Sequence, residues 1–310
     1  MLEYRQSSVV EEAHRDGGWC IVPVDGGEGE VSLVSGGMEG SIKGWRSGSG
    51  ELREGFRVDG HSLGVVSLAR SRDGARLATM SLDGYLKLWK WEDGEVVEEG
   101  KVDANVAEAW GLCFNPDGTQ IASGSHSFRV NIWSCGEEPT RESSLKSERG
   151  SMVMNVAYSP DGRLIAAGSS DGSIQLFDVE SGSVSTKLPG HALTVRSLKF
   201  STTEPDILIT SADDQMINIY DTRNSQLTSN LQGHNGFVFS VDLHDDNVRI
   251  ASASADKTVK VWDRRAKECN FTSKAHDDLV WGACFFDNGS KLASISDDKR
   301  ICVVDCTNTA

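Results

Sequence analysis

A large apolar residue ends a short strand pattern seven times along this 310-residue chain. The seven positions are Trp45, Trp89, Trp133, Phe177, Tyr220, Trp262 and Val304. They are 44, 44, 44, 43, 42 and 42 residues apart, so the repeat occupies nearly the whole chain. A period of about 40–45 residues is typical of propeller blades, none of which can bury both of its faces alone. We therefore expect an all-β, seven-bladed propeller, formed by residues 1–310 as a single domain.

Each repeat reads as four short strands joined by tight turns. The clearest unit runs from His234 to Asp263, where apolar and polar residues alternate and clusters of Gly, Asn and Asp separate the strands. Only five residues follow Asp305, so the seventh unit lacks room for its fourth strand. We expect the segment 2–10 to supply this strand and close the ring, which removes exposed sheet edges.

Polar residues recur at fixed distances from the seven apolar positions, which we call anchors. Ten residues before the anchors stand Ser35, Thr79, Ser123, Ala167, Thr210, Ser252 and Ser294. Six before them stand Glu39, Asp83, Ser127, Asp171, Asp214, Asp256 and Asp298. Five units open with a histidine: His14, His61, His191, His234 and His276. Ser, His and Asp could form a nucleophilic triad, but an active site needs one constellation, and this chain repeats the same one, so we expect a structural role.

This pattern resembles the WD-repeat family over the whole chain. The resemblance implies a buried hydrogen-bond network in each blade, which His234, Ser252, Asp256 and Trp262 match best. Units three and four carry Asn105 and Arg149 near the histidine position, so their networks should be incomplete. Unit one departs as well, because Glu39 replaces the aspartate.

Charge and motif content argue against several classes of function. Thirty-one basic and 46 acidic residues give a net charge of −15, which would repel RNA and anionic membranes. No phosphate-binding loop, zinc-protease motif or zinc-type Cys and His spacing occurs, so we expect neither an enzyme nor a cofactor or metal site. The seven cysteines form no C-x-x-C pair, and no signal peptide or run of 18 apolar residues is present. An intracellular protein is expected.

One further set of equivalent positions varies in an informative way. Five residues after each opening histidine, or its equivalent, stand Trp19, Val66, Trp110, Met154, Arg196, Phe239 and Trp281. The preceding residue is mostly Val or Ala and looks like core, so period-two alternation would place this set on the opposite face, near the mouth of the central channel. These side chains could merely pack between blades. Alternatively, they form a ring of aromatic anchors for a partner.

Neighbouring residues favour a peptide ligand for this ring. Phe237 and Glu108 lie two residues before ring members, and Asp213 and Asp297 come from adjacent turns on the same side. Aromatic rings beside carboxylates could hold a short peptide that carries an arginine and a large apolar residue. Other paired carboxylates, such as Asp245-Asp246, are expected to be solvated loop residues.

Several longer segments resemble the seven-bladed WD-repeat subunits of the superkiller complex. They are GHSLGVVSL (60–68), AWGLCFNPDG (109–118), VMNVAYSPDGRLIAAGSSDGSIQLFDV (153–179), GHALTVRSLKFS (190–201), DDLVWGACF (277–285) and SISDDKRICVVDC (294–306). The resemblance implies a non-catalytic scaffold that serves exosome-linked 3′-to-5′ mRNA decay together with a helicase and a repeat-scaffold subunit. It also implies a nuclear role in the polymerase-associated factor complex, in transcription elongation and histone modification, and hence a location in nucleus and cytoplasm. Such subunits bind partner motifs of Gln-Arg followed by an apolar residue on the loop face.

A second resemblance keeps a different class open. The segments 208–223 and 250–265 resemble the box by which WD-repeat substrate receptors dock on the adaptor of cullin-type ubiquitin ligases. The docking residues would be Asp221 with Arg223 and Asp263 with Arg265. Because this box overlaps ordinary blade sequence, it also arises by chance.

Overall fold

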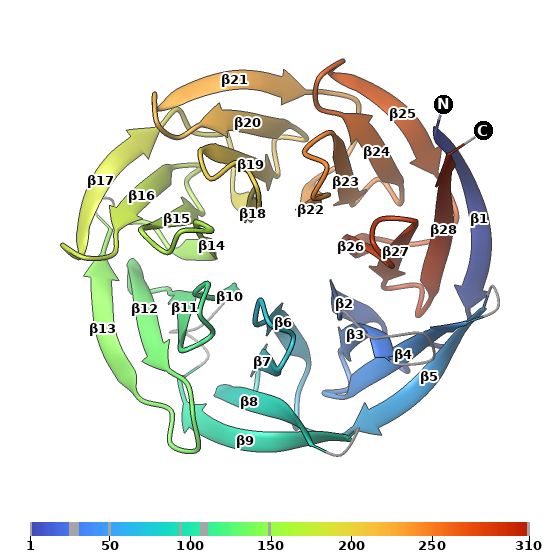
Figure 1. The fold of residues 1–310 in the computed structure, drawn as a ribbon, viewed down its shortest axis with the longest axis horizontal. Coiled ribbons are helices and arrows are strands. Elements are labelled where there is room, and N and C mark those ends of the chain that lie inside the picture. The colour runs from blue at the N-terminus through green and yellow to red at the C-terminus, as the bar shows by residue number, and fades with distance from the viewer. Residues whose placement is uncertain are drawn as a thin grey trace.

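The chain folds into a ring of seven radial sheets (Figure 1). The computed structural model describes residues 2–24, 31–48, 51–92, 95–105, 111–147 and 150–308, and in these ranges it contains strands and turns but no helix. Every sheet has four antiparallel strands. The seven-bladed all-β propeller expected from the anchor spacing is therefore confirmed. No helix suited to crossing a membrane occurs among the described residues.

The first four blades follow one another along the chain. Blade 1 contains β2 (Gly18–Pro23), β3 (Val31–Gly37), β4 (Ile42–Gly48) and β5 (Glu51–Val58). Blade 2 contains β6 (Val65–Arg70), β7 (Arg76–Ser81), β8 (Tyr85–Glu92) and β9 (Glu95–Asp103). Blade 3 contains β10 (Leu112–Phe114), β11 (Gln120–Gly124), β12 (Arg129–Ser134) and β13 (Arg141–Lys146). Blade 4 contains β14 (Val153–Tyr158), β15 (Leu164–Ser169), β16 (Ile174–Asp178) and β17 (Ser183–Leu188).

The last three blades complete the circle. Blade 5 contains β18 (Val195–Phe200), β19 (Ile207–Ala212), β20 (Ile217–Asp221) and β21 (Gln226–Leu231). Blade 6 contains β22 (Val238–Leu243), β23 (Arg249–Ser254), β24 (Val259–Asp263) and β25 (Glu268–Ser273). Blade 7 contains β26 (Val280–Phe286), β27 (Lys291–Ser296), β28 (Ile301–Asn308) and, as its outer strand, β1 (Leu2–Val10).

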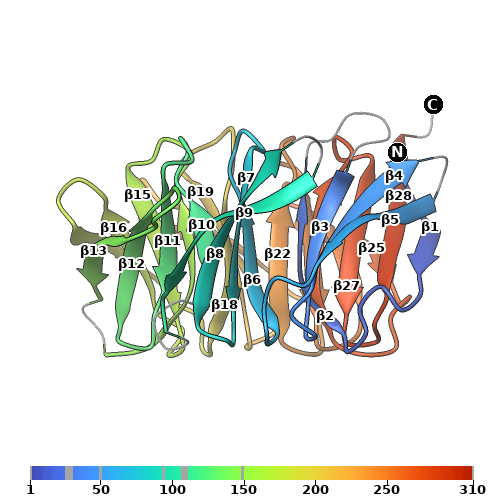
Figure 2. The same cartoon turned by 90° about the horizontal axis from the view of Figure 1, so that it is seen from below.

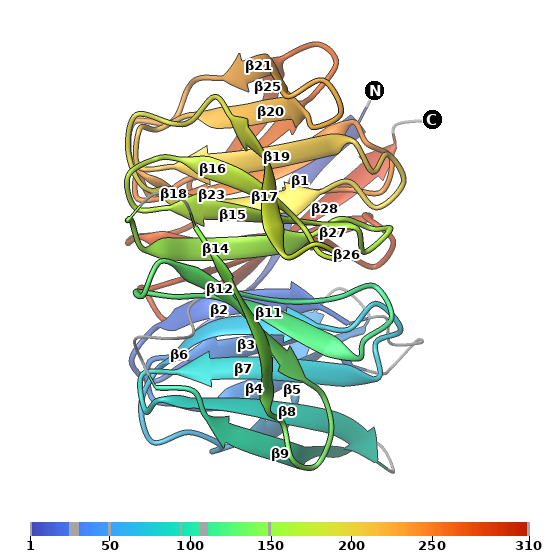
Figure 3. The same cartoon turned by 90° about the vertical axis from the view of Figure 1, so that its left-hand side faces the viewer.

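In each blade the first strand is innermost and the last strand forms the rim (Figure 1). Seen edge-on, the strands run between the two flat faces of a disc (Figures 2 and 3). One face carries the loops that lead from each outer strand to the next inner strand, together with the turns between the second and third strands. We call it the loop face.

The two ends of the chain meet in blade 7. β1 pairs antiparallel with β28 from Leu2 opposite Asn308 to Val10 opposite Ile301, and both ends lie at one edge of the ring (Figure 1). Tyr4 of β1 also stacks on Phe271 of blade 6, with ring centroids 5.1 Å apart. Closure by the amino-terminal strand, expected from the missing seventh outer strand, is confirmed.

The hydrophobic core lies between blades. Trp262 of blade 6, for example, belongs to a buried cluster that includes Ile209 and Ile217 of blade 5. All seven anchors are buried. Since each blade covers its neighbour, a single blade would leave an apolar face exposed to water, and the blades depend on one another for stability.

A hydrogen-bond network ties the loop face of a blade together. In blade 6, His234 contacts Asp256 through Nδ1 at 2.8 Å and Ser252 through Nε2 at 2.7 Å. The indole Nε1 of Trp262 donates to the Ser252 hydroxyl at 2.8 Å. The network fastens the loop that enters the blade to the turn between its second and third strands. It thereby sets where the inner strand begins.

The networks of the other blades differ in completeness. Blade 2 has the full set, and blade 1 has it as well, with Glu39 in the aspartate position 2.7 Å from His14. In blade 5 the hydroxyl of Tyr220 donates instead to the carbonyl of Pro189. Blade 4 has Ala167 and Phe177 at the serine and tryptophan positions, and neither side chain can form a hydrogen bond. In blade 3 the indole of Trp133 still donates to Ser123, and Asn105 replaces the histidine.

The carboxyl groups of these networks have lowered pKa values. Burial alone would raise the pKa of Glu39, but hydrogen bonds from His14 and Ser41 outweigh burial and bring it from 4.5 to about 2. Burial is likewise outweighed, by histidine and backbone N–H groups, at four further carboxyls. They are Asp83, Asp214, Asp256 and Asp298, whose pKa values are all lowered.

We therefore expect acid to weaken the ring. A carboxyl with a lowered folded pKa stabilises the fold above its unfolded pKa, and this contribution is lost as the pH falls through the folded pKa. For Glu39 the loss runs from about pH 4.5 to about pH 2 and, because solvent screens part of the interaction, amounts to at most about 3 kcal/mol. Urea unfolding of the wild type and of Glu39→Gln, at neutral pH and at about pH 3, measures this loss of stability. The variant should lose less stability on acidification, and equal losses would contradict the assignment.

A candidate peptide-binding surface at the channel mouth

The inner strands share an irregularity at the point where they enter the channel. In blade 2, Val65 pairs with Ser81 and Ser67 with Met80, so Val66 is an extra residue without a partner on β7. The same one-residue bulge occurs in the six blades that the structure describes at this point. The bulged residues are Trp19, Val66, Met154, Arg196, Phe239 and Trp281. Because a bulge redirects the side chain of its extra residue, one side chain per blade is turned toward the channel.

The sequence pattern attributed the direction of these side chains to simple period-two alternation, whereas in the structure the bulge turns them toward the channel. The preceding valines are fully buried, as expected: Val65, Val153, Val195, Val238 and Val280. Strict alternation would make Ser67 the next core residue of blade 2, whereas the buried residue is Leu68. The bulge therefore shifts the alternation by one residue. Trp110 and Glu108 lie outside the described residues.

A channel of about 560 Å³ runs along the axis of the ring, and the six bulged side chains are part of its lining. A cavity of this size is within the range that binds small ligands or side chains of a partner. The mouth of the channel is aromatic on one side, where blades 6, 7 and 1 contribute rings, whereas blades 2 and 4 contribute the aliphatic Val66 and Met154.

Four aromatic rings form a continuous cluster across blades 6, 7 and 1. Phe239 and Trp281 are stacked, with centroids 4.3 Å apart and planes 17° from parallel. Trp19 meets Trp281 edge-on at 6.4 Å, and Phe237 meets Phe239 edge-on at 6.4 Å. Phe237 remains 44% exposed, and the other three rings are half-buried. The cluster thus packs between blades and also presents an apolar surface to solvent.

Exposed apolar side chains gather on the loop face as a whole. Seven large hydrophobic residues are exposed in the described part of the chain, and six of them lie in loops, turns or strand starts of this face: Met38, Leu63, Tyr85, Phe128, Leu193 and Phe237. The sequence pattern did not single out Leu63 and Met38. A Cβ on Gly64 would lie 2.6 Å from the Trp19 ring and 3.3 Å from Met38 Cα, so this glycine allows blades 1 and 2 to pack beside the aromatic cluster.

The two described carboxylates of the predicted site differ in their surroundings. Asp213 is held by Arg196 through two hydrogen bonds of 2.8 Å, and the guanidinium lies 5.9 Å from the Phe239 ring centroid. Asp213 was expected to meet a cation of a partner. In the structure Arg196 neutralises it, because the bulge of blade 5 turns the arginine toward the adjacent turn.

Among the described residues, no cationic side chain pairs with the corresponding carboxylate of blade 7. Asp297 occupies the position of Asp213, and Trp281 occupies the position of Arg196. Asp297 Oδ1 and Trp281 Nε1 are both buried and have no hydrogen-bond partner within the described structure. A buried polar atom without a hydrogen-bond partner costs free energy, so a ligand that bonds to these two atoms would remove that cost.

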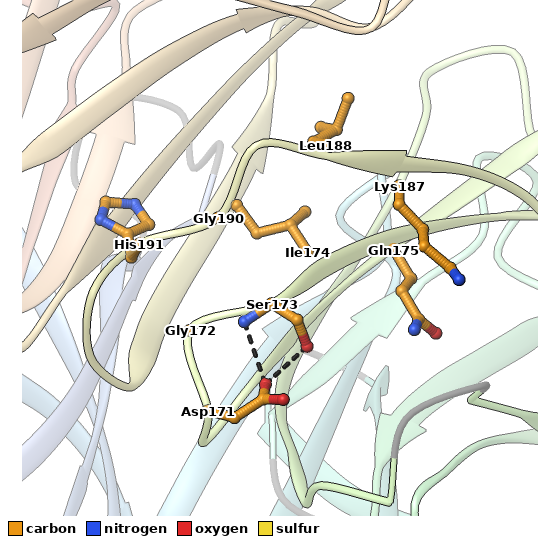
Figure 4. Close-up of a pocket in the computed structure, with 9 residues that line it drawn as sticks. All are labelled: Asp171, Gly172, Ser173, Ile174, Gln175, Lys187, Leu188, Gly190 and His191. Carbon is orange, nitrogen blue, oxygen red and sulfur yellow. Dashed lines mark hydrogen bonds between the residues drawn. The ribbon is translucent and has the colours of Figure 1, made fainter.

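A second, smaller cavity of about 200 Å³ lies away from the mouth, over blade 4 (Figure 4). Its lining residues are Asp171, Gly172, Ser173, Ile174, Gln175, Lys187, Leu188, Gly190 and His191. Asp171 accepts hydrogen bonds from the backbone N–H and the hydroxyl of Ser173, as Figure 4 shows. No group of acidic, histidine and cysteine side chains suited to holding a metal ion occurs among the described residues.

The residues of the ligase-type box serve turns on the opposite face. Asp221 accepts the backbone N–H of Arg223, whose side chain is paired with Asp206. Asp263 accepts the backbone N–H of Arg265 at 2.7 Å. These contacts explain the Asp-x-Arg spacing by local turn structure.

The seven blades, their anchors and the repeated His, Ser or Thr, Asp and Trp network define a WD-repeat β-propeller. Residues 28–305 match the family model described as the IFT122 first beta-propeller, and the chain belongs to this family. The apoptotic protease-activating factor 1 of Danio rerio is 41% identical over 64 residues, which are 21% of this chain and 5% of that protein. The chain thus matches only a small part of this relative's length.

Proposed function

We propose that the chain is a non-catalytic scaffold that binds peptide segments of its partners at the mouth of the channel, on the loop face. The observation that carries the proposal is the aromatic cluster of blades 6, 7 and 1 beside the unpartnered carboxylate oxygen of Asp297. Aromatic side chains dominate interface hot spots, and a half-buried cluster gives a partner side chain a desolvated seat.

The chemistry of the ligand follows from a comparison between blades. The guanidinium of Arg196 in blade 5 is held by the Asp213 carboxylate and lies against the Phe239 ring of blade 6. In blade 7, Asp297 takes the place of Asp213, Trp281 takes the place of Arg196, and Trp19 of blade 1 takes the place of Phe239. An arginine of a partner would give Asp297 the contact that Asp213 already has, and a large apolar residue beside it would cover the rings.

The resemblance to the superkiller-complex WD-repeat subunits gives this scaffold its proposed partners. They are the superkiller helicase and repeat-scaffold subunits in the cytoplasm and subunits of the polymerase-associated factor complex in the nucleus. A net charge of −15 suits a subunit that leaves RNA to its partners. Affinity purification followed by mass spectrometry tests the assignment. Recovery of a cullin adaptor in place of these subunits would overturn it.

The Trp281→Ala variant tests the site itself. If Trp281 is a hot spot, binding of a fluorescent Gln-Arg-containing peptide should weaken by about 2 kcal/mol, or about 30-fold in Kd. Asp297→Asn should also weaken binding of this peptide, and it should have less effect on a peptide in which alanine replaces the arginine. The control is Leu227→Ala, which changes an exposed residue of β21 away from the loop face. Unchanged affinity in both mouth variants would exclude the site.

A further inference from the structure

Phe128 combines two features that are unfavourable for the isolated chain, a strained backbone conformation and an exposed aromatic ring. It lies in the turn between β11 and β12 with a φ of 64° and is 42% exposed. The equivalent turn residues of the other blades also have positive φ: Gly40, Gly84, Gly172, Gln215, Lys257 and Lys299. Three are glycines, and the other three are polar. A bulky aromatic residue is rare in this backbone region, and here its ring is only partly buried.

Two basic residues lie beside Phe128. Arg129 begins β12 directly opposite Lys146 of β13, and the backbone N–H of Ser147 donates to the Phe128 carbonyl at 2.9 Å. Like charges directly opposite each other destabilise a sheet. Neither basic side chain forms an ion pair with another described residue, although the chain as a whole carries a net charge of −15.

Blade 7 shows what an arginine at this position does when acids are near. Arg300, the equivalent of Arg129, contacts Glu11 at 2.7 Å and Asp277 at 2.8 Å. The same backbone position thus holds an arginine with two carboxylates in one blade and an arginine without an ion-pair partner, within the described chain, in another. Strain and exposure that persist at one site are grounds for a functional hypothesis.

We propose that Phe128, Arg129 and Lys146 form a second docking surface, on the loop face of blade 3, for an acidic peptide segment that contains a large apolar residue. The apolar residue would cover the Phe128 ring, and the acidic residues would give Arg129 and Lys146 the partners that Arg300 has within the chain. This surface is opposite in charge preference to the mouth, where Asp297 requires a cation. One scaffold could then hold two unlike segments at once and raise the effective concentration of each for the other.

The test starts with phage-displayed random dodecapeptides selected on the full chain. Acidic sequences with a large apolar residue should be enriched, and the strongest of them, labelled with fluorescein, serves as the probe. Phe128→Gly should raise the Kd for the probe by at least about tenfold. The double variant Arg129→Ser with Lys146→Ser should do the same. Phe128→Gly should leave the thermal midpoint unchanged or raise it, because glycine relieves the backbone strain. A purely structural role for Phe128 would lower the midpoint.

Two controls separate this surface from its alternatives. Trp281→Ala should leave probe binding unchanged, so failure of the mouth site and failure of this surface are distinguishable. Arg129→Glu with Lys146→Glu should shift the selected peptides from acidic to basic. Selection without acidic sequences, or equal affinity of the probe for the wild type and Phe128→Gly, would overturn the proposal. So would binding of a single-stranded RNA oligonucleotide that competes with the probe and is lost in the Glu variant, since the surface would then be a nucleic-acid site.

Discussion

A chain that lacks residues 1–12 is expected to lose most of the stability of the ring. The deletion removes the outer strand of blade 7 and leaves one edge of β28 unpaired. It also removes side chains at both interfaces of this blade. Val10 packs against the cluster between blades 7 and 1, and Tyr4 packs against the cluster between blades 6 and 7.

The size of the effect follows from these two side chains. Full burial of a valine or of a phenylalanine-sized ring contributes about 1.5–3 kcal/mol, and Val10 and Tyr4 are partly buried, so together they account for about 2–4 kcal/mol. A whole domain is stable by only about 5–15 kcal/mol. Circular dichroism should therefore show a much lower thermal midpoint. The exposed edge of β28 should also make the truncated chain aggregate.

A circular permutant controls for the loss of sequence as such. Leu2 lies opposite Asn308, so residues 1–12 joined after residue 310 through a short Gly-Ser linker can form a hairpin with β28. This chain begins at residue 13 and keeps every side chain of the wild type. It should recover the thermal midpoint, and a truncated chain as stable as the wild type would refute the role of β1 in closure.

The fold could be predicted because the repeat itself reflects how the blades pack. Anchors such as Trp89 and Trp262 are buried between blades, so one anchor recurs in each four-stranded unit of the sequence. The closing strand could be predicted because a seventh blade with three strands would leave an edge exposed. Both inferences rest on local pattern and on counting, which a sequence displays directly.

The site could be predicted only in part. Comparing equivalent positions singled out Trp19, Phe239 and Trp281 as candidates. The bulge that turns them toward the channel changes strand pairing and leaves no mark in the apolar pattern. Nor does the pattern show that Arg196 neutralises Asp213, because this contact joins two segments of blade 5 across a turn. Whether the two side chains meet depends on the directions in which they point, and the spacing of residues along the sequence does not specify those directions.

Blade 1 shows a compensation that the sequence does carry, at two positions taken together. Glu39 is one methylene longer than the usual aspartate, yet it contacts His14 as the aspartates contact their histidines. Eight residues before the anchors, the other blades have Ser81, Ser125, Ser169, Ala212, Ser254 and Ser296, whereas blade 1 has Gly37. A Cβ on Gly37 would overlap the His14 ring and the Glu39 carboxyl. The missing side chain makes room for the longer one.

Gly37→Ser alone is therefore expected to cost about 3 kcal/mol, because the new side chain must displace the buried pair of His14 and Glu39. Glu39→Asp alone should cost about 1–2 kcal/mol, because the shorter carboxylate leaves the His14 ring less well bonded. The double variant recreates the arrangement of blade 2, where the backbone N–H of Asp83 donates to Ser81 at 3.1 Å. It should be nearly as stable as the wild type.

Urea unfolding of the four proteins gives the coupling free energy, which should favour the double variant by about 3 kcal/mol or more. Gly48→Ser is the matched control. It adds the same side chain to the same blade, but a Cβ on Gly48 meets no atom within 4 Å, so stability should change by less than about 0.5 kcal/mol. Additive losses in the double variant would show that Gly37 and Glu39 act independently. A favourable coupling would show that the small residue at position 37 compensates for the longer carboxylate at position 39. The hydrogen-bond network of blade 1 is then preserved with glutamate in the aspartate position.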